Sequence, residues 1–214
     1  MVKGIIFDMD GVISDTQKLH AAVEAKILNR FGVNITPEEL TRKYSGVRTG
    51  EFFDVLLKQQ GAAYDLDGLM KEKWGEMAKL ASLGVDEIPG SVDLIKRLYE
   101  EKYPLALASA STSDYVHSVL EALKITPYFS AVVSGDMVAN GKPDPESFLL
   151  AASKIGVAPQ DCVVIEDGIN GMEGAKRANM FCIGLVKDKN GLYPTNNLIM
   201  SLSEITSDYL KNLK

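Results

Sequence analysis

The sequence predicts an α/β fold in which a Rossmann-like parallel sheet core carries an inserted all-helical domain. Three observations indicate this fold. They are an apolar run at 5–7 that ends in an acidic turn, strands alternating with helices over 89–185, and a block at 16–84 without a strand-like stretch. Alternating strands and helices are typical of a parallel sheet covered by helices on both faces. We therefore expect a core domain of residues 1–15 and 85–214 and a helical insertion of residues 16–84.

The first expected strand, Ile5-Ile6-Phe7, is short and apolar, as buried strands are. It must pair with the later strands, because one strand alone is not stable. It ends in Asp8 and Asp10, followed by Gly11. Ligands of an open α/β sheet bind outside the carboxyl ends of its strands, where two neighbouring anions favour a bound cation or proton. The alternative is an ordinary Asp-x-Asp-Gly turn.

The block after this turn has the periodicity and the end signals of helices. Apolar residues recur at helical spacing from 16 to 31, and Gly32 ends that stretch. Thr36 and Pro37 begin the next helix, as N-cap and first helical residue. The expected helices cover residues 16–31, 36 onward, 50 onward and 65–82. The expected hinges of the insertion are residues 13–16 and 84–89.

The second half of the chain supplies the rest of the sheet. We expect helices at 91–102, 113–124, 145–155 and 170–178. We expect strands at 105–109, 131–134, 162–166 and 181–185. Each of these strands follows a helix, which is the order that parallel sheets require.

Composition and charge exclude several classes of protein. The chain has 214 residues, of which 46% are hydrophobic, and a formal net charge of −6. A negative chain is a poor ligand for nucleic acid or an anionic membrane, so we expect neither partner. No signal peptide pattern and no run of about 18 apolar residues occurs, which predicts a cytoplasmic protein. Cys162 and Cys182 lie in apolar stretches and are expected to be buried thiols. The oligomeric state is open, with a monomer as our expectation.

Polar residues follow two further expected strands. Ser109 and Ala110 follow the strand at 105–109, where backbone N–H groups and a hydroxyl could wrap an anion. The alternative is a plain Ser/Thr helix cap. Lys142 is followed by Pro143 in a proline-stiffened loop that would hold a positive charge in place. The alternative is a solvated loop lysine.

A second acidic pair, Glu166 and Asp167, ends the strand at 162–166. The glycines that follow have the spacing G-x-x-G-x-x-G and not G-x-G-x-x-G, and a pyrophosphate would face two carboxylates there. We therefore exclude dinucleotide binding. The four strand-end carboxylates carry four negative charges, of which Lys142 offsets one. A hard divalent cation, Mg²⁺, would offset two more, and such a site suits transfer of a phosphoryl group.

At this point the sequence resembles the haloacid dehalogenase (HAD) superfamily of phosphotransferases, with four motifs in order at strand ends. The matching residues are Asp8-Met9-Asp10-Gly11-Val12, Ser109, Lys142 and Glu166-Asp167. The resemblance covers nearly the whole chain, and it makes the helical insertion similar to the helical cap of HAD-type proteins.

The resemblance implies roles for the acidic residues. Asp8 is the implied nucleophile, which forms an aspartyl-phosphate, and it is also a ligand of Mg²⁺. Asp10 is the implied general acid and base, and its carbonyl oxygen also binds the metal. Asp167 is the second carboxylate on the metal, with Glu166 as a direct or outer-shell ligand.

The remaining motif residues are implied to hold the phosphate. Ser109 and the amide of Ala110 bind its oxygens, and Lys142 neutralises the transferring group.

Within the superfamily the sequence is most similar to the β-phosphoglucomutase-like branch, which contains mutases and small-metabolite phosphatases. The residues that carry this likeness include Thr16, His20, Arg48 and Ala108-Ser109-Ala110-Ser111. In the mutases a cap arginine and a cap lysine help to hold the substrate. Arg48 lies one position before the place of that arginine, where this chain has Thr49, and Lys73 is a loose match for the lysine.

These insertion residues have simpler interpretations as well. Thr16 can be only the cap of the first helix, or its hydroxyl can contact the substrate from the expected hinge. His20 can be a packing histidine or can couple closure to proton transfer. Arg48 and Lys73 can be substrate ligands or solvated charges.

The sequence is compatible with three functions. The first is a Mg²⁺-dependent phosphatase of small phosphorylated metabolites, in the first place sugar phosphates. The second is a β-phosphoglucomutase-type phosphomutase that works through the same aspartyl-phosphate. The third is a receiver module that takes phosphate on aspartate without turnover, which would not need the insertion at 16–84.

Overall fold

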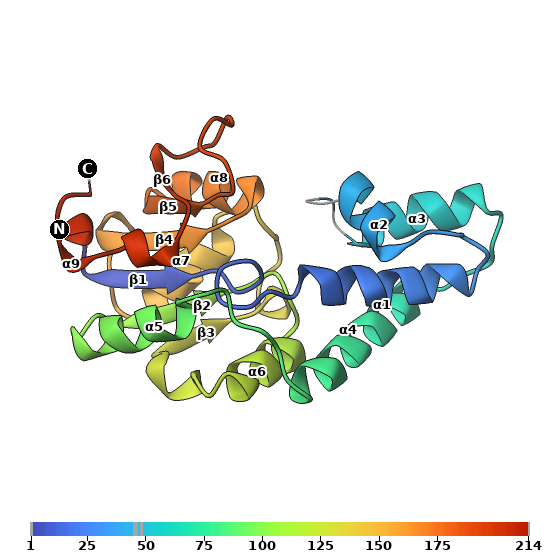
Figure 1. The fold of residues 1–214 in the computed structure, drawn as a ribbon, viewed down its shortest axis with the longest axis horizontal. Helices are drawn as coiled ribbons and strands as arrows, with labels where there is room; N and C mark the ends of the chain where they lie inside the picture. The colour runs from blue at the N-terminus through green and yellow to red at the C-terminus, as the bar shows by residue number, and fades with distance from the viewer. Residues whose placement is uncertain (1, 45–46, 48, 214) are drawn as a thin grey trace.

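The structure is a computed structural model that describes residues 2–44, 47 and 49–213. This part of the chain forms a six-stranded sheet in the order β3-β2-β1-β4-β5-β6, in which all neighbours are parallel (Figure 1). The strands are β1 (Gly4–Phe7), β2 (Leu105–Ala108), β3 (Ala131–Val133), β4 (Cys162–Glu166), β5 (Phe181–Leu185) and β6 (Asn197–Ile199). This is the α/β fold that the sequence predicts.

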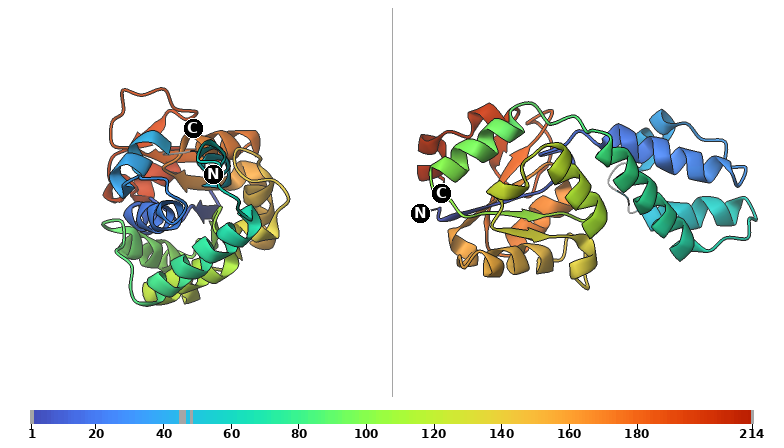
Figure 2. Two further views of the ribbon diagram at one scale, coloured as in Figure 1. Left: turned by 90° about the vertical axis from the view of Figure 1, so that its right-hand side faces the viewer. Right: turned by 90° about the horizontal axis from the view of Figure 1, so that it is seen from below.

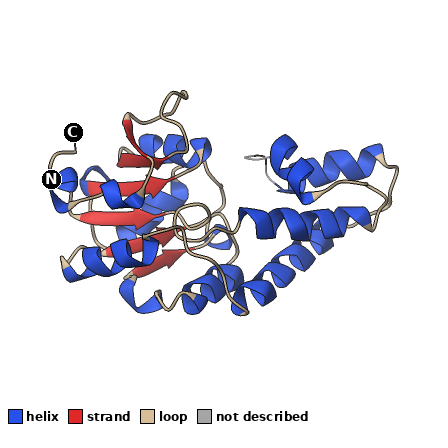
Figure 3. Cartoon of the chain, viewed as in Figure 1, coloured by secondary structure: helices blue, strands red, loops and turns tan. Residues whose placement is uncertain are grey.

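Helices cover both faces of the sheet. They are α5 (Ser91–Glu100), α6 (Ser113–Ala122), α7 (Glu146–Lys154), α8 (Ile169–Arg177) and α9 (Ser207–Lys211). Side chains alternate across a strand, so Ile5 and Phe7 belong to the apolar cluster of α5, α6 and α9, and Ile6 belongs to that of α7 and α8. Figure 2 shows the resulting three layers, and Figure 3 shows the strands in red with helices overlapping them.

A block of four helices separates β1 from β2 along the chain. These are α1 (Gln17–Asn29), α2 (Pro37–Tyr44), α3 (Thr49–Gln59) and α4 (Leu66–Ser82). The strand arrows point toward this block, and both termini lie at the opposite end of the molecule (Figure 1). The residues that the sequence predicted at two helix ends have the expected end geometry in the structure. Thr36 and Glu39 form a reciprocal capping box at the start of α2, and Gly32 has a φ of 82° after α1.

Two antiparallel segments connect the α1–α4 block to the sheet. Asp15 N donates to Asp86 O at 2.9 Å, and Ile88 N donates to Ile13 O at 2.8 Å. Ser14 and Glu87 form an antiparallel bridge between them. These segments fall within the hinges expected at 13–16 and 84–89. Their role as hinges and the domain boundaries at 15/16 and 84/85 stay predictions.

Most elements lie where the sequence predicts them. The strands β4 and β5 have the predicted bounds, and helix ends differ by at most two residues. The sequence analysis missed β6 and α9, which have 3 and 5 residues. Short elements without clear periodicity give little signal, and turn-forming Asn and Thr residues precede β6. Among the helices of the described residues, none is long and apolar enough for a membrane crossing.

Candidate active site

The candidate site lies at the carboxyl end of the middle strands. The strand β1 has β2 on one side and β4 on the other, so the chain order reverses beside β1. Asp8 follows β1 and its N–H donates to Ile165 O at 3.0 Å, while Ser109 follows β2 and donates to Val133 O at 2.9 Å. Such a topological switch point is the usual ligand crevice of an open α/β sheet.

Lys142 joins two of the strand-end carboxylates. Its Nζ donates to Asp8 Oδ1 at 2.5 Å and to Glu166 Oε1 at 2.8 Å, and also to Ala108 O at 3.1 Å. The ammonium lies 4.8 Å from the centre of the Phe148 ring, and its side chain is 8% exposed. Lys142 is therefore a fixed, largely buried charge and not a solvated loop lysine.

Three carboxylates lie close enough to share a cation. One oxygen from each of Asp8, Glu166 and Asp167 lies within 4.8 Å of the others. Both oxygens of Glu166 already accept hydrogen bonds, one from Lys142 and the other from the Gly168 N–H at 2.7 Å. A set of hard oxygen donors fits a hard divalent cation. The hydrogen bonds of Glu166 favour an outer position for that residue.

Two glycines leave the space that these carboxylates occupy. Gly11 has a φ of 92°, and a Cβ at this position would lie 2.2 Å from Asp167 Oδ2. A Cβ at Gly171 would lie 1.6 Å from Glu166 Oε1. The second glycine of the G-x-x-G-x-x-G run thus makes room for an acidic side chain, in agreement with the exclusion of dinucleotide binding.

The local charges perturb the pKa values of the cluster. Burial raises the pKa of Asp8 well above its ordinary value against the attraction of Lys142, and the neighbouring carboxylates raise it further. Desolvation by the surrounding protein, followed by the charge of Glu166, raises the pKa of Asp167 to about 7. Burial lowers the pKa of Lys142, but Asp8 and Glu166 outweigh this effect and raise it. The carboxylates thus carry more negative charge than Lys142 neutralises, and a divalent cation would offset the excess.

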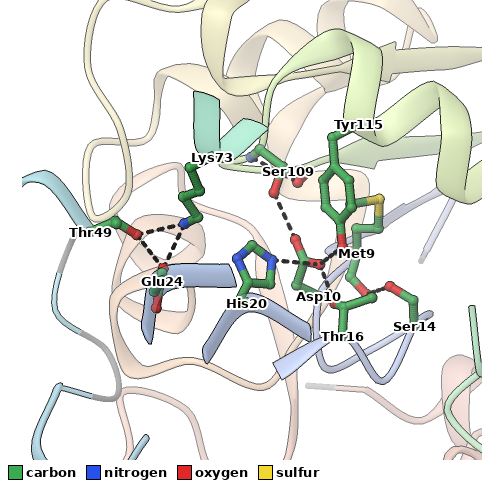
Figure 4. Close-up of polar contacts among 11 residues, drawn as sticks. Met9, Asp10, Ser14, Thr16, His20, Glu24, Thr49, Lys73, Ser109 and Tyr115 are labelled. Carbon is green, nitrogen blue, oxygen red and sulfur yellow. Dashed lines mark hydrogen bonds and ion pairs between the residues drawn. The ribbon is translucent and has the colours of Figure 1, made fainter. Parts of the chain in front are cut away.

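Asp10 is held by hydrogen bonds from both sides of the site. Its Oδ1 accepts from Thr16 Oγ1 at 2.5 Å and from Tyr115 OH at 3.3 Å, and its Oδ2 accepts from Ser111 Oγ at 2.8 Å. His20 Nε2 lies 3.5 Å from Oδ1 (Figure 4). Although burial raises the pKa of Asp10, the interactions with His20, Thr16 and Ser111 lower it to about 2.

The α1–α4 block supplies two of these partners. Thr16 precedes α1 but makes no side-chain capping bond, because its hydroxyl donates to Asp10. The His20 ring meets Tyr115 edge-on at 5.6 Å and Trp74 at 5.7 Å between ring centres. His20 therefore packs between α4 and α6 and also faces Asp10. Its role in coupling closure to proton transfer stays a prediction.

The expected phosphate side lies at the end of β2. Ser109 is buried, and its Oγ accepts a hydrogen bond from the Ser111 N–H at 3.0 Å. Ala110 is exposed. The N-cap residue of α6 is Thr112, from the Ser/Thr run that the sequence offered as a plain cap, but its side chain makes no capping hydrogen bond. Ser109 does not cap this helix.

The contacts that hold Lys73 lie within the α1–α4 block. Lys73 Nζ lies 2.7 Å from Glu24 Oε1 and donates to Thr49 Oγ1 at 2.6 Å, all within the helical block. It is therefore not a solvated charge. Arg48 lies outside the described residues. Its role and that of Lys73 as substrate ligands stay predictions.

Sequence reasoning missed three residues of this neighbourhood. Ser111 was part of a motif run but had no role, and Tyr115 and Glu24 gave no signal at all. A tyrosine in a helix and a glutamate on an amphipathic helix are ordinary residues in sequence. Their contacts depend on how α1, α4 and α6 pack.

Comparison with known proteins agrees with this geometry. Residues 5–185 match the family model described as haloacid dehalogenase-like hydrolase. A phosphorylated carbohydrates phosphatase of Thermotoga maritima is 32% identical over 179 residues, which cover 84% of this chain and 82% of that protein. A fructose-1-phosphate phosphatase of Escherichia coli is 32% identical over 177 residues, covering 83% and 93%. The crystal structure of a β-phosphoglucomutase from Clostridium difficile superimposes with a TM-score of 0.84 at 27% identity, covering 99% and 96%.

Proposed function

The chain belongs to the haloacid dehalogenase-like hydrolases, and from this premise we propose that it is a Mg²⁺-dependent phosphatase of small phosphorylated metabolites. Sugar phosphates are the proposed substrate class. The Thermotoga maritima and Escherichia coli relatives, whose names give phosphorylated carbohydrates and fructose 1-phosphate as substrates, support this choice.

The observation that carries the proposal is the position of Asp8. Its carboxylate accepts a hydrogen bond from Lys142 and has an oxygen within 4.8 Å of an oxygen of Glu166 and of Asp167. We propose that Asp8, Asp167 and the carbonyl oxygen of Asp10 hold Mg²⁺ and that Glu166 supports them from its bond to Lys142. When bound, the ion would offset negative charge and orient a phosphoryl oxygen.

In the first step, an Asp8 carboxylate oxygen attacks the phosphorus of the substrate. The bond between phosphorus and the sugar oxygen breaks, and that oxygen takes a proton from Asp10. The products of this step are the free sugar and an aspartyl-phosphate on Asp8. Lys142, the Ser109 hydroxyl and the Ala110 amide stabilise the charge on the phosphoryl oxygens.

In the second step, water attacks the phosphorus of the aspartyl-phosphate. Asp10 accepts the proton of the water, the bond between phosphorus and Asp8 breaks, and inorganic phosphate leaves. A carboxyl with a pKa of about 2 is ionised at neutral pH, so Asp10 has the unprotonated form that this step needs. An incoming phosphate places negative charge beside Asp10 and raises its pKa, which favours the protonated form needed in the first step.

A panel of sugar phosphates and nucleotides tests the proposal. We expect repeated release of inorganic phosphate from at least one sugar monophosphate, loss of that release in EDTA, and its return with added Mg²⁺. Conversion to an isomeric sugar phosphate that depends on a bisphosphate activator would instead identify a phosphomutase, the activity named for the Clostridium difficile structure. One phosphorylation per protein without turnover would identify a receiver module. Indifference to EDTA would overturn the metal assignment.

A further inference from the structure

A second polar cluster lies inside the α1–α4 block, made of Glu24, Thr49 and Lys73. Lys73 Nζ lies 2.7 Å from Glu24 Oε1 and donates to Thr49 Oγ1 at 2.6 Å, and the Thr49 hydroxyl donates to Glu24 Oε1 at 2.8 Å. The three side chains form a closed ring of contacts from α1, α3 and α4 (Figure 4). We call these residues the helix-block triad.

The positive charge of the helix-block triad is buried and paired with a carboxylate. Lys73 has three N–H donors. Two are matched by Glu24 and Thr49, and the ammonium also lies 4.4 Å from the centre of the Trp74 ring. The Lys73 side chain is 2% exposed. A phosphate could reach this charge only by breaking contacts that Lys73 already makes.

The helix-block triad lies beside the candidate site. Glu24 follows His20 by four residues on α1, so the two side chains share one face, about 6 Å apart along the helix. His20 faces Asp10, and its ring packs against Trp74, the neighbour of Lys73 (Figure 4). A substrate whose leaving oxygen approaches Asp10 would extend past His20 toward Glu24.

We propose that the helix-block triad determines specificity: Glu24 accepts hydrogen bonds from hydroxyl groups at the far end of the substrate and rejects a second phosphate there. One carboxylate and one ammonium leave no net positive charge, and the Glu24 side chain is the more exposed of the two, 10% against 2% for Lys73. Lys73 and Thr49 are positioning residues that hold this carboxylate. The inferred substrate class is sugar or polyol monophosphates. This inference rests on the proposed function.

The wild-type protein provides the first test. We compare kcat/KM for phosphate release from C1 of fructose 1-phosphate and of fructose 1,6-bisphosphate, or from the corresponding pair for a hexose monophosphate that is hydrolysed faster. We expect the monophosphate to be favoured by about tenfold or more, since about 1.4 kcal/mol of like-charge repulsion gives a factor of ten. Equal or greater kcat/KM for the bisphosphate would overturn the proposal.

The second test removes the negative charge of the triad. Glu24→Gln keeps the shape of the side chain and leaves the charge of Lys73 uncompensated, so the preference for the monophosphate should shrink about tenfold or reverse. Glu76→Gln is the matched control, because Glu76 forms an ion pair with Lys26 between the same two helices, α1 and α4, on the exposed side at 3.3 Å. We expect this control to leave the preference unchanged. An unchanged preference in Glu24→Gln would contradict the proposal.

The two proposals fail in different ways. If no sugar monophosphate releases phosphate, the proposed function is wrong. If monophosphates are hydrolysed but bisphosphates are hydrolysed as well or better, only the role of the helix-block triad is wrong. The assays are run at low temperature with the folded fraction checked by circular dichroism. The wild-type comparison decides the question if Glu24→Gln does not fold.

Discussion

Two polar clusters in this molecule differ in their charge balance. The strand-end cluster places three carboxylates, Asp8, Glu166 and Asp167, around one ammonium, that of Lys142. The helix-block triad places one carboxylate beside one ammonium and adds a hydroxyl that bonds to both. The first has excess negative charge, and the second is neutral.

The difference in charge balance fits the different roles that we propose for the two clusters, catalysis for the strand-end cluster and substrate recognition for the helix-block triad. Desolvation raises the pKa values of Asp8 and Asp167, the charges of the neighbouring carboxylates raise them further, and a bound cation would offset both effects. The Glu24–Lys73 pair has balanced charges and needs no further cation, and its contacts hold the two side chains in one arrangement. The comparison supports our proposals, which assign the metal and the phosphoryl group to the strand ends and the contacts to the rest of the substrate to the α1–α4 block.

The largest expected effect follows from removing the nucleophile of the strand-end cluster. Asp8→Asn should lower kcat at least about 10³-fold, because an amide cannot form the aspartyl-phosphate. The fold should persist, since Lys142 keeps its bond to Glu166. Phosphate release and circular dichroism measure both effects. Turnover near the wild-type rate in a folded variant would remove Asp8 as the nucleophile.

The next effect tests how much the ion pair of the helix-block triad contributes to the free energy of unfolding. Glu24→Gln should lower the free energy of unfolding by about 3 kcal/mol, because it leaves a buried ammonium without its carboxylate. Glu76→Gln should lower it by less than about 1 kcal/mol, because the Lys26 side chain of that pair is 70% exposed. Urea unfolding of both variants measures the difference. Equal losses would show that burial does not distinguish the two ion pairs.

A smaller effect concerns the contact region between the two clusters, where Tyr115 meets both His20 and Asp10. Tyr115→Phe keeps the ring packing against His20 and removes the hydrogen bond to Asp10 Oδ1. We expect kcat to fall by up to about tenfold with the KM nearly constant, since one such bond contributes about 1 kcal/mol. A change in KM alone would mean that Tyr115 acts on substrate binding and not on Asp10.

The smallest effect is the response of stability to Mg²⁺ and pH. The pKa of Asp167 is raised to about 7, so its protonated form stabilises the metal-free protein, fully below pH 4 and no longer above pH 7. Mg²⁺ binds the deprotonated form, so its stabilising effect should grow as pH rises through this range, reaching about 2–4 °C in Tm. Thermal melts with and without Mg²⁺ measure this.

Asp167→Asn is the control for that response. It should lose most of the Mg²⁺ effect, and without metal it should melt higher than the wild type at pH 8, because one repelling charge is gone. A Mg²⁺ response that is independent of pH in the wild type would argue against these carboxylates as ligands.

The sequence predicted the strand-end cluster well because its residues follow strands directly. The parallel order of β1, β2 and β4 brings Asp8, Ser109 and Glu166 to one edge whatever the details of packing. Lys142 was also predicted, although its loop position did not show that it bonds to both Asp8 and Glu166.

The helix-block triad could not be predicted in the same way. Glu24 meets Lys73 only because α1 and α4 pack side by side, and the helical pattern of either segment does not give its rotation against the other. The same holds for Tyr115, whose hydroxyl reaches Asp10 across the contact of α6 with α1. Local patterns predict the elements, and the contacts between elements come from tertiary packing.

Trapping the phosphorylated intermediate tests the central claim most directly. The wild-type protein is mixed with Mg²⁺ and the best sugar monophosphate, quenched within one turnover, reduced with borohydride, and digested for mass spectrometry. We predict reduction of a single aspartyl-phosphate in the peptide that contains Asp8, and no such product from Asp8→Asn. Turnover with no modification of that peptide, or modification of a different residue, would contradict the account.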